Sequence, residues 1–160
     1  MKTNVFSFIV EDPQERSYDQ IEEIIAKDYD DILFGSTNGE FELDFEIKDI
    51  SMMSAINKAI EYIAPINLVV KRISPDSYVT ASEIARRVHI SREGVRKMIS
   101  GDIKSKNTFP RPSFFLSGSS VWVWPVVVRW FYENGKTDIE KVKEAKDIYS
   151  KNKELEDVLI

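Results

Sequence analysis

The hydrophobic and polar positions in the first half of the chain follow a period of two in several segments. The segment EFELDFEIK at 40–48 alternates strictly between apolar and charged side chains, which predicts a strand with one solvated face. Runs rich in β-branched and aromatic residues at 4–10, 31–36 and 66–73 predict three more strands. An Asn-Gly pair between the second and third of these four strands indicates a hairpin.

Two segments between these strands follow the period of a helix. Isoleucines at helical spacing predict a helix over 17–29, capped by Ser17 or Asp19, and a similar spacing predicts another over 51–64. The resulting order, strand-helix-strand-strand-helix-strand, is that of a ferredoxin-like βαββαβ domain, with two helices on one face of a four-stranded antiparallel sheet. We expect this domain over residues 1–74.

The pattern changes after the turn-rich connector 74–78. The stretch TASEIARRVHISREGVRKMI at 80–99 holds two short amphipathic segments separated by a tight His-Ile turn. Thr80 and Glu83 predict a capping box at the first helix, Ser91 caps the second, and a glycine ends it. Two short helices joined in this way form the helix-turn-helix pattern.

A hairpin is predicted next. The segment FPRPSFFLSGSSVWVW at 109–124 indicates two strands joined at SGSS. Pro125 suits the first turn of a further helix, which Gly135 ends. Because a hairpin after a helix-turn-helix is a wing, we expect a winged helix-turn-helix domain over residues 75–135.

The last segment, 136–160, predicts one more helix. Thr137 and Glu140 match a capping box, and a narrow apolar stripe begins at Ile139 and fails at Asn152. This stripe is too short for a long coiled coil and indicates a packing or dimerising helix with a frayed end. The expected fold class is therefore α+β, with a ferredoxin-like domain, a winged helix-turn-helix domain and a C-terminal helix.

Charge is segregated along the chain, whose formal net charge is −5. Residues 1–70 hold 5 Lys/Arg against 15 Asp/Glu, a net charge of −10. Residues 71–130 hold 11 against 4, a net charge of +7, and residues 131–160 hold 6 against 8. A basic segment inside an acidic chain is typical of a surface that binds a polyanion.

The composition argues against several functional classes. The chain has no cysteine, so disulfides and thiolate metal sites are excluded, and its one histidine, His89, lies in the predicted turn. The sequence contains no phosphate loop and no motif that joins an acid, a base and a nucleophile, so we expect neither an enzyme nor a cofactor. The longest apolar run, VWVWPVVV, is too short to span a bilayer, and no signal peptide is recognisable. We therefore expect a cytoplasmic protein with no membrane partner.

The succession of motifs in residues 78–132 resembles a known family. VTASEIARRVHISREGVRKMI, followed by FPRPSFFLSGSSVWVWPVVVRWF, is similar to the winged helix-turn-helix domain of AlpA- and excisionase-type regulators, relatives of the MerR type. That family combines T-x-x-E-[IAV]-A and [IV]-S-x-x-x-V helices with FP-x-P, a wing, and V-W before a helix ending in W. One departure is VWVWPVVV, which is apolar where the family usually has a charged or polar residue after V-W.

The resemblance implies that the second helix, 91–100, enters the major groove of DNA. Arg92, Glu93 and Arg96 would then lie nearest the base edges, where Arg pairs with guanine and Glu accepts from cytosine. The remaining candidates are expected to contact phosphates or, from the wing, the minor groove. They are Arg86, Arg87, Ser91 and Lys97 on the helices, and Lys104, Lys106, Arg111 and Ser119 on the wing and its approach.

Two further groups of residues favour structural interpretations. The aromatic residues around the hairpin are expected in the core rather than as a platform for bases. They are Phe114, Phe115, Trp122, Trp124, Trp130 and Phe131. The acidic row Glu40, Glu42, Asp44 and Glu46 is expected on a solvated sheet face that could also repel DNA or meet a basic partner. Residues two apart on a strand are roughly 6.5–7 Å apart, too far to share one ion without other strands.

The sequence thus favours a sequence-specific double-stranded DNA-binding protein, a small transcriptional regulator. We expect a homodimer, because operators with two half-sites are usually read by dimers. The N-terminal domain would provide self-association or sense a protein or small molecule. Two alternatives stay open: an excisionase-like protein that bends DNA for recombination, and a protein-interaction adaptor that uses the helix-turn-helix as a scaffold.

Overall fold

The computed structural model describes residues 1–159, with side chains described for residues 1–158. Over that range the chain is an α+β protein with two antiparallel sheets and six α-helices. It divides into an acidic unit, Met1–Pro75 with Asp147–Ile160, and a basic unit, Asp76–Lys146. The acidic unit holds 9 Lys/Arg and 19 Asp/Glu, a net charge of −10, and the basic unit holds 13 and 8, a net charge of +5.

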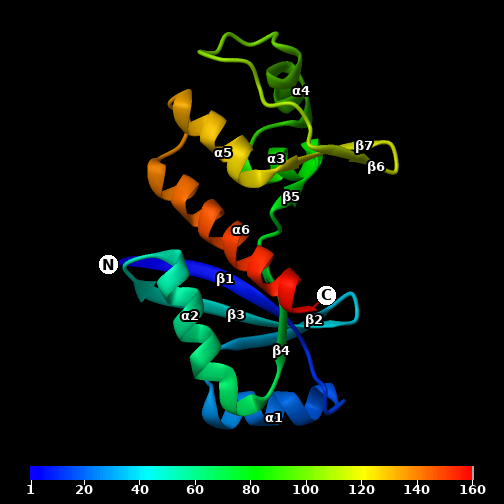
Figure 1. The fold of residues 1–160 in the computed structure, drawn as a ribbon, viewed down its shortest axis with the longest axis vertical. Helices are drawn as coiled ribbons and strands as arrows, with labels where there is room; N and C mark the ends of the chain where they lie inside the picture. The colour runs from blue at the N-terminus through cyan, green and yellow to red at the C-terminus, as the bar shows by residue number, and fades with distance from the viewer. Residues whose placement is uncertain (160) are drawn as a thin grey trace. The chain divides into compact units, whose positions relative to one another are not determined.

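The acidic unit is built on a four-stranded antiparallel sheet with the strand order β2-β3-β1-β4 (Figure 1). The order of its elements along the chain is the predicted one. They are β1 (Lys2–Glu11), α1 (Tyr18–Asp28), β2 (Leu33–Thr37), β3 (Glu40–Asp49), α2 (Met52–Ile63), a 3-10 turn η1 (Ala64–Ile66), β4 (Val69–Ser74) and the second part of α6 (Ile139–Leu159).

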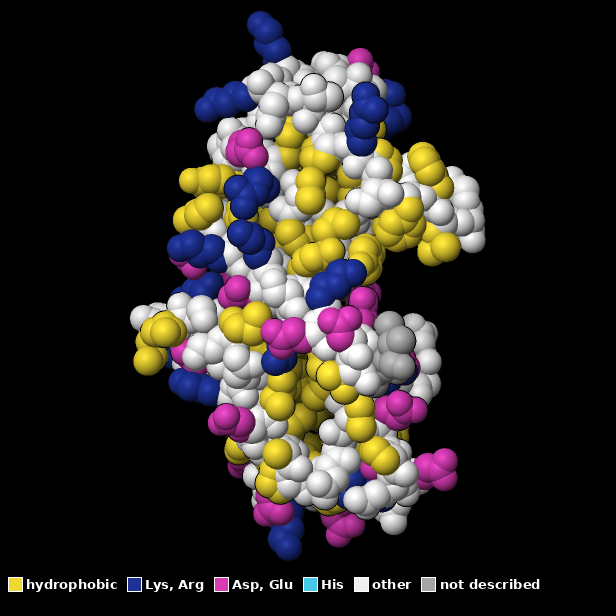
Figure 2. Space-filling model, in the orientation of Figure 1, with side chains coloured by type: hydrophobic (Ala, Val, Ile, Leu, Met, Phe, Trp, Pro, Cys, Tyr) yellow, Lys and Arg dark blue, Asp and Glu magenta, His cyan; other side chains and the backbone are white. Residues whose placement is uncertain are grey.

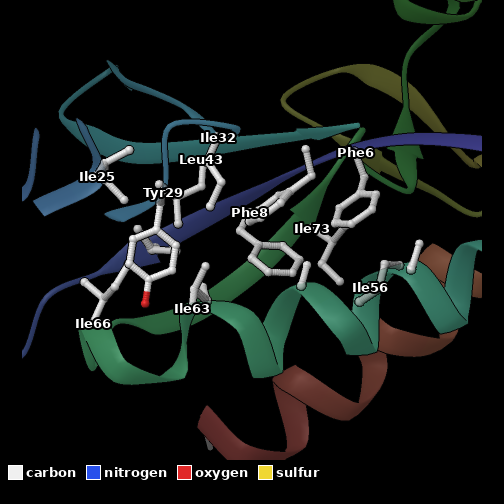
Figure 3. Packing of buried hydrophobic residues seen from close by; sticks show 14 of the residues in the cluster. Phe6, Phe8, Ile25, Tyr29, Ile32, Leu43, Ile56, Ile63, Ile66 and Ile73 are labelled. Atoms are coloured by element: carbon white, nitrogen blue, oxygen red, sulfur yellow. The ribbon is translucent and has the colours of Figure 1, made fainter. Parts of the chain in front are cut away.

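Alternation along β1 separates the two faces of this sheet. The side chains of Phe6 and Phe8 are at most 2% exposed, whereas Val5, on the same strand but facing the other side of the sheet, is 64% exposed. Both helices contribute to the cluster that contains Phe6 and Phe8, so α1 and α2 cover one face of the sheet (Figure 3). The other core residues that Figure 3 labels are Ile25, Tyr29, Ile32, Leu43, Ile56, Ile63, Ile66 and Ile73.

Local signals fix several ends of these elements, as the sequence predicts. Ser17 and Gln20 form a capping box at α1, in which the Ser17 Oγ accepts from the Gln20 N–H and the Gln20 side chain accepts from the Ser17 N–H. Asn38 and Gly39 make the predicted hairpin turn with left-handed φ angles of 52° and 78°. Glycine and asparagine tolerate that conformation better than other residues.

The second part of α6 completes the acidic unit. Asp147 Oδ2 accepts from the Met53 N–H at the start of α2, at 3.1 Å, and Ile148 is buried in the core. Asn152 bonds both backbone groups of Ile73, with distances of 2.7 Å to its N and 3.0 Å to its O. The side-chain amide of Asn152 therefore pairs with β4 as a neighbouring strand would.

The basic unit contains a three-stranded antiparallel sheet with the order β5-β7-β6 and a separate core. The buried side chains Ile84, Val95, Trp122, Val127 and Trp130 lie in this core. The elements are β5 (Tyr78–Val79), α3 (Ala81–Val88), α4 (Arg92–Ser100), β6 (Phe114–Leu116), β7 (Ser119–Val123), α5 (Trp124–Glu133) and the first part of α6.

The first part of α6 packs within the basic unit. Val142 and Ala145 form a small buried cluster with Val128 of α5. The expected cap is one residue off: α6 begins at Ile139, and Asp138 rather than Thr137 caps it, because the Asp138 carboxylate accepts from the Lys141 N–H at 3.1 Å. The residues of α6 up to Lys146 belong to the basic unit, and those from Asp147 onward belong to the acidic unit. The predicted end of the helix, residue 160, lies outside the described range.

Other predicted boundaries are also wrong. The strand expected at 66–73 begins only at Val69, because Ala64–Ile66 forms a 3-10 turn around Pro65 and Asn67 is left-handed with a φ of 61°. The connector expected at 74–78 contributes Tyr78 to β5, which pairs with β7. The hairpin strands are shorter than the predicted segment 109–124. These differences arise from pairing with distant residues and from proline, which lacks the N–H of a strand.

The described helices provide no membrane span: none within residues 1–159 is both long enough and apolar enough to cross a bilayer.

Candidate nucleic-acid interface

The first helix of the helix pair, α3, begins at a side-chain cap. Thr80 Oγ1 accepts from the Glu83 N–H at 3.3 Å, which is one half of the expected capping box. The other half is wrong, because the Glu83 carboxylate accepts from Arg86 Nε and Arg87 Nε, each at 2.9 Å. The hydrogen bond from Arg86 is the largest cause that lowers the pKa of Glu83 from its ordinary value. Ile84 faces the core.

The two arginines of α3 differ in accessibility. The side chain of Arg86 is 76% exposed, whereas that of Arg87 is 12% exposed. The Arg87 guanidinium lies over the ring of Trp124, with its central carbon 5.1 Å from the ring centroid. Arg86 is therefore available to an external partner, while Arg87 packs inside the basic unit.

The turn between the helices is tight. His89 ends α3 in a left-handed conformation with a φ of 58°, and the Ile90 N–H donates to the Ala85 carbonyl at 3.1 Å. His89 is thus a turn residue, as the sequence predicts. Ser91 then starts α4, because its Oγ accepts from the Gly94 N–H at 2.9 Å. The expected cap at Ser91 is confirmed.

Helix α4 has one buried face and one charged face. Val95 and Met98 lie in the core. The opposite face presents exposed polar side chains, namely Arg92, Glu93, Arg96 and Lys97. Arg96 donates two hydrogen bonds to the Glu93 carboxylate, at 2.9 and 2.7 Å, and this lowers the pKa of Glu93. The structure therefore brings together, on one face, the three residues expected nearest to base edges.

The segment between α4 and the hairpin carries further cations. Lys104, Lys106 and Arg111 are all exposed, and Figure 2 shows Lys and Arg side chains over α4 and this segment. Its backbone is anchored where two tryptophan indoles donate to carbonyl oxygens. Trp130 Nε1 bonds the Asn107 carbonyl at 3.0 Å, and Trp122 Nε1 bonds the Pro110 carbonyl at 2.9 Å.

The hairpin of β6 and β7 projects a short turn. Ser117 and Gly118 form this turn with left-handed φ angles of 50° and 80°, and Leu116 pairs with Ser119 across it. Ser119 is exposed beside the turn, where its hydroxyl can reach a partner.

The expectation for the aromatic residues is right in the core and wrong on the hairpin. Trp122, Trp130 and Phe131 are each 3% exposed. Phe114 and Phe115 are 41% and 71% exposed, because β6 lies at the edge of the sheet, beyond the helices that cover the core. These two residues are candidate contacts that the sequence analysis missed. The signal available for Phe115 was the serine pair Ser119–Ser120 on the second strand of the hairpin, where Ser120 faces Phe115.

The acidic row on β3 is mostly engaged by neighbouring residues. Glu40 accepts from Lys71 Nζ at 3.0 Å and from Arg72 Nη2 at 2.8 Å, which lowers its pKa to about 2, with the hydrogen bond from Arg72 as the largest cause. Asp44 accepts from the Ser7 hydroxyl at 2.6 Å. Within residues 1–159 no three His, Asp or Glu side chains are grouped so as to hold a metal ion.

The exposed side chains of the basic unit offer several kinds of hydrogen-bond donor. They include guanidinium groups for bidentate hydrogen bonds, lysines for phosphates and an exposed hydroxyl at a hairpin turn. The comparisons with protein-family models, with curated proteins and with solved structures found no match for this chain.

Proposed function

We propose that the basic unit is a winged helix-turn-helix domain and that the protein is a small transcriptional regulator that binds double-stranded DNA. In this proposal α3 and α4 are the helix pair, and β6 and β7 form the wing. Helix α4 enters the major groove with Arg92, Glu93 and Arg96 toward the base edges. The exposed cations elsewhere in the unit bind phosphates.

The observation that carries the proposal is the exposed face of α4. Arg92, Glu93, Arg96 and Lys97 are exposed on that face and carry three cations and one carboxylate, while Val95 and Met98 are buried on the other. The ion pair between Arg96 and Glu93 is exposed on both sides, so breaking it costs little. Arg96 can then exchange the carboxylate for guanine, and Glu93 becomes free to accept from cytosine.

The acidic unit supports a second part of the proposal. Its element order, its strand order β2-β3-β1-β4 and its two helices on one face favour a ferredoxin-like domain. Its net charge of −10 makes it unsuited to contact DNA. We assign it self-association or sensing, in a protein that binds DNA as a homodimer in the cytoplasm.

The test is selection of bound sequences from a random duplex library with the full chain and with the Arg92→Ala/Arg96→Ala variant. We expect one enriched motif with the wild type and none with the variant, because each bidentate arginine contact discriminates by about 1–3 kcal/mol. A palindromic motif would further indicate a dimer.

The matched control is Lys141→Ala/Lys143→Ala, which removes two exposed cations from α6 in the same basic unit. This control should retain the motif of the wild type. Absence of any enrichment with the wild type at moderate salt would refute sequence-specific binding and would favour the adaptor alternative. DNA binding without enrichment, together with strong bending, would favour the excisionase-like alternative.

A further inference from the structure

The edge strand of the hairpin exposes more apolar surface than a small sheet edge requires. Leu116, next to the turn, is 64% exposed, and Phe115 is 71% exposed. Both pair with serines of β7, so no large side chain from the neighbouring strand covers them. Figure 2 shows hydrophobic side chains gathered over this hairpin. Exposed apolar groups on a projecting element mark a contact with a partner.

The charges around the hairpin indicate which partner. The chain carries no Asp or Glu between Asp102 and Glu133, and the cations in that interval include exposed Lys104, Lys106 and Arg111. Carboxylates are thus absent from the whole sequence that forms the hairpin and its approach. The hairpin strands carry no charge of their own, but the unit that holds them has a net charge of +5. A second basic unit would bring like charges together, whereas a polyanion would meet complementary charge.

We propose that Leu116 and Phe115, which follow each other on β6 and point to opposite faces of the hairpin, form an apolar wedge that enters the minor groove of bound DNA and kinks it at one base step. Apolar side chains inserted from the minor groove unstack neighbouring base pairs and bend the duplex toward the major groove. Arg111, which precedes β6 along the chain, contacts a neighbouring phosphate, and Ser119 reaches the groove beside the wedge. This inference rests on the proposed DNA-binding function.

The wedge also defines the preferred DNA. Pyrimidine-purine steps such as TA unstack most readily, while A-tracts are stiff. The wedge recognises this deformability and makes no hydrogen bond to a base edge. A TA step should therefore be favoured at the wing even in DNA that lacks the motif read by α4.

The experiment compares two duplexes of about 30 base pairs with the same A·T content and the same charge. One alternates dA and dT, so that TA steps recur throughout, and the other is dA paired with dT as an A-tract. The alternating duplex carries 2-aminopurine to report unstacking, and dyes at both ends of each duplex report bending by energy transfer. The full chain is compared at low salt with Phe115→Ser/Leu116→Ser, with Leu116→Met, and with Val126→Ser on α5 as an exposed apolar control.

The wild type, Leu116→Met and Val126→Ser should increase 2-aminopurine fluorescence and bend the alternating duplex by about 20–90°. They should also bind it more tightly than the A-tract. Phe115→Ser/Leu116→Ser should keep binding both duplexes through phosphate contacts but lose the fluorescence increase, the bend and the preference.

The contrary outcomes are distinct. Wild-type binding without unstacking or bending would overturn the wedge and leave the proposed function intact. Failure of the wild type to bind either duplex at low salt would overturn both. Unstacking that survives Phe115→Ser/Leu116→Ser would overturn the wedge. A wild-type oligomer that this variant converts to monomers without DNA would identify the hairpin as a contact between copies, and it would overturn the wedge too.

Discussion

Arg86 and Arg87 are adjacent on α3 and share the Glu83 carboxylate as acceptor, yet their surroundings differ. Arg87 is covered on one side by the Trp124 ring and is largely removed from solvent. A desolvated cation over an aromatic ring stabilises a fold more than an exposed ion pair does. Arg87 therefore contributes to the stability of the basic unit, and Arg86 remains a candidate DNA contact.

Replacing Arg87 with Ala should lower the free energy of unfolding of the basic unit by about 1–3 kcal/mol, because packing on Trp124 and a hydrogen bond to Glu83 are lost together. All three tryptophans of the chain lie in this unit, so tryptophan fluorescence in a urea titration follows its unfolding. Arg86→Ala should leave the urea midpoint unchanged. Equal losses for the two variants would contradict the assignment of Arg87 to packing.

The two ion pairs that Glu40 forms, with Arg72 and with Lys71, should make the stability of the acidic unit depend on pH. The folded pKa of Glu40 is about 2 and its ordinary value is 4.5, so the unfolded chain binds the proton more tightly. The contribution of Glu40 is then fully present above pH 4.5 and lost as the pH falls toward 2. We expect Glu40→Gln to lower the Tm near neutral pH, with a difference from wild type that shrinks over this range in circular dichroism melts.

Glu46→Gln is the control for that series, because Glu46 is an exposed carboxylate on the same strand. Its Tm should stay close to the wild-type value near neutral pH. A Glu40→Gln variant whose deficit in Tm persists at the lowest pH would show that Glu40 acts through packing rather than charge.

At the scale of elements, α6 covers part of the edge that β4 gives to the sheet of the acidic unit. An unpaired edge strand offers its backbone groups to other chains, and the Asn152 amide occupies the N–H and C=O of Ile73. In the sequence, Asn152 stands out only because it interrupts the apolar stripe of the predicted helix. The reason for that failure is a polar contact with β4, a strand far away along the chain.

Asn152→Ala should destabilise the acidic unit by about 1–3 kcal/mol, because both backbone groups of Ile73 lose their partner. Hydrogen exchange followed by mass spectrometry should show faster exchange in peptides covering β4, with little change in the basic unit. Ser150→Ala, at an exposed position on the same helix, is the matched control and should exchange like the wild type. Unchanged protection of β4 in Asn152→Ala would contradict this role.

Periodicity and caps predicted the elements that depend on local signals. The helices near 17–29, 51–64 and 80–99 and the Asn38–Gly39 turn all follow from residues within a few positions of each other. The two-residue strand β5 and the exposure of Phe115 depend instead on pairing with β7 and on where the helices end. From sequence alone, an aromatic residue in an alternating strand is predicted to be buried, because the sequence does not reveal that the strand lies at the edge of its sheet.

In the candidate site, too, the features set by local spacing were predicted and those set by distant residues were not. Spacing on α4 correctly separated Val95 from Arg92 and Arg96, because a helix of period 3.6 has only one side for the core. It could not separate Arg86 from Arg87, since the Trp124 ring that covers Arg87 comes from another part of the chain. The contacts of Glu83 with both arginines likewise override its expected role in a capping box.

At the scale of the whole molecule, the segregation of charge between the units governs how the protein would respond to salt. A net charge of +5 on the basic unit attracts a polyanion, and −10 on the acidic unit opposes nonspecific association. Screening weakens both effects as ionic strength rises. In the proposed complex, the salt dependence of DNA binding would count the phosphate contacts, independently of the bases proposed to contact α4.

Lys104→Ala/Lys106→Ala should reduce the slope of log K against log salt by about 1.8, since each phosphate contact contributes about 0.9. The enriched sequence should stay the same, because these lysines contact only phosphates in the proposed complex. Fluorescence anisotropy over a salt series measures the slope. If the variant instead selected a different sequence with the same salt slope, these lysines would contact bases rather than phosphates, and the roles assigned to them would be wrong.

The contact between Asn152 and β4 also has a consequence for the order of synthesis. All four strands of the acidic unit are contained in the first 75 residues, but the side chain that covers the outer edge of β4 is translated only after the entire basic unit. During translation the finished sheet thus waits with its β4 edge uncovered while a further 71 residues, Asp76–Lys146, are added. When several ribosomes translate one messenger RNA, the uncovered β4 edges of neighbouring nascent chains come close together. We therefore expect nascent chains in that interval to associate through the β4 edge more readily than finished chains do.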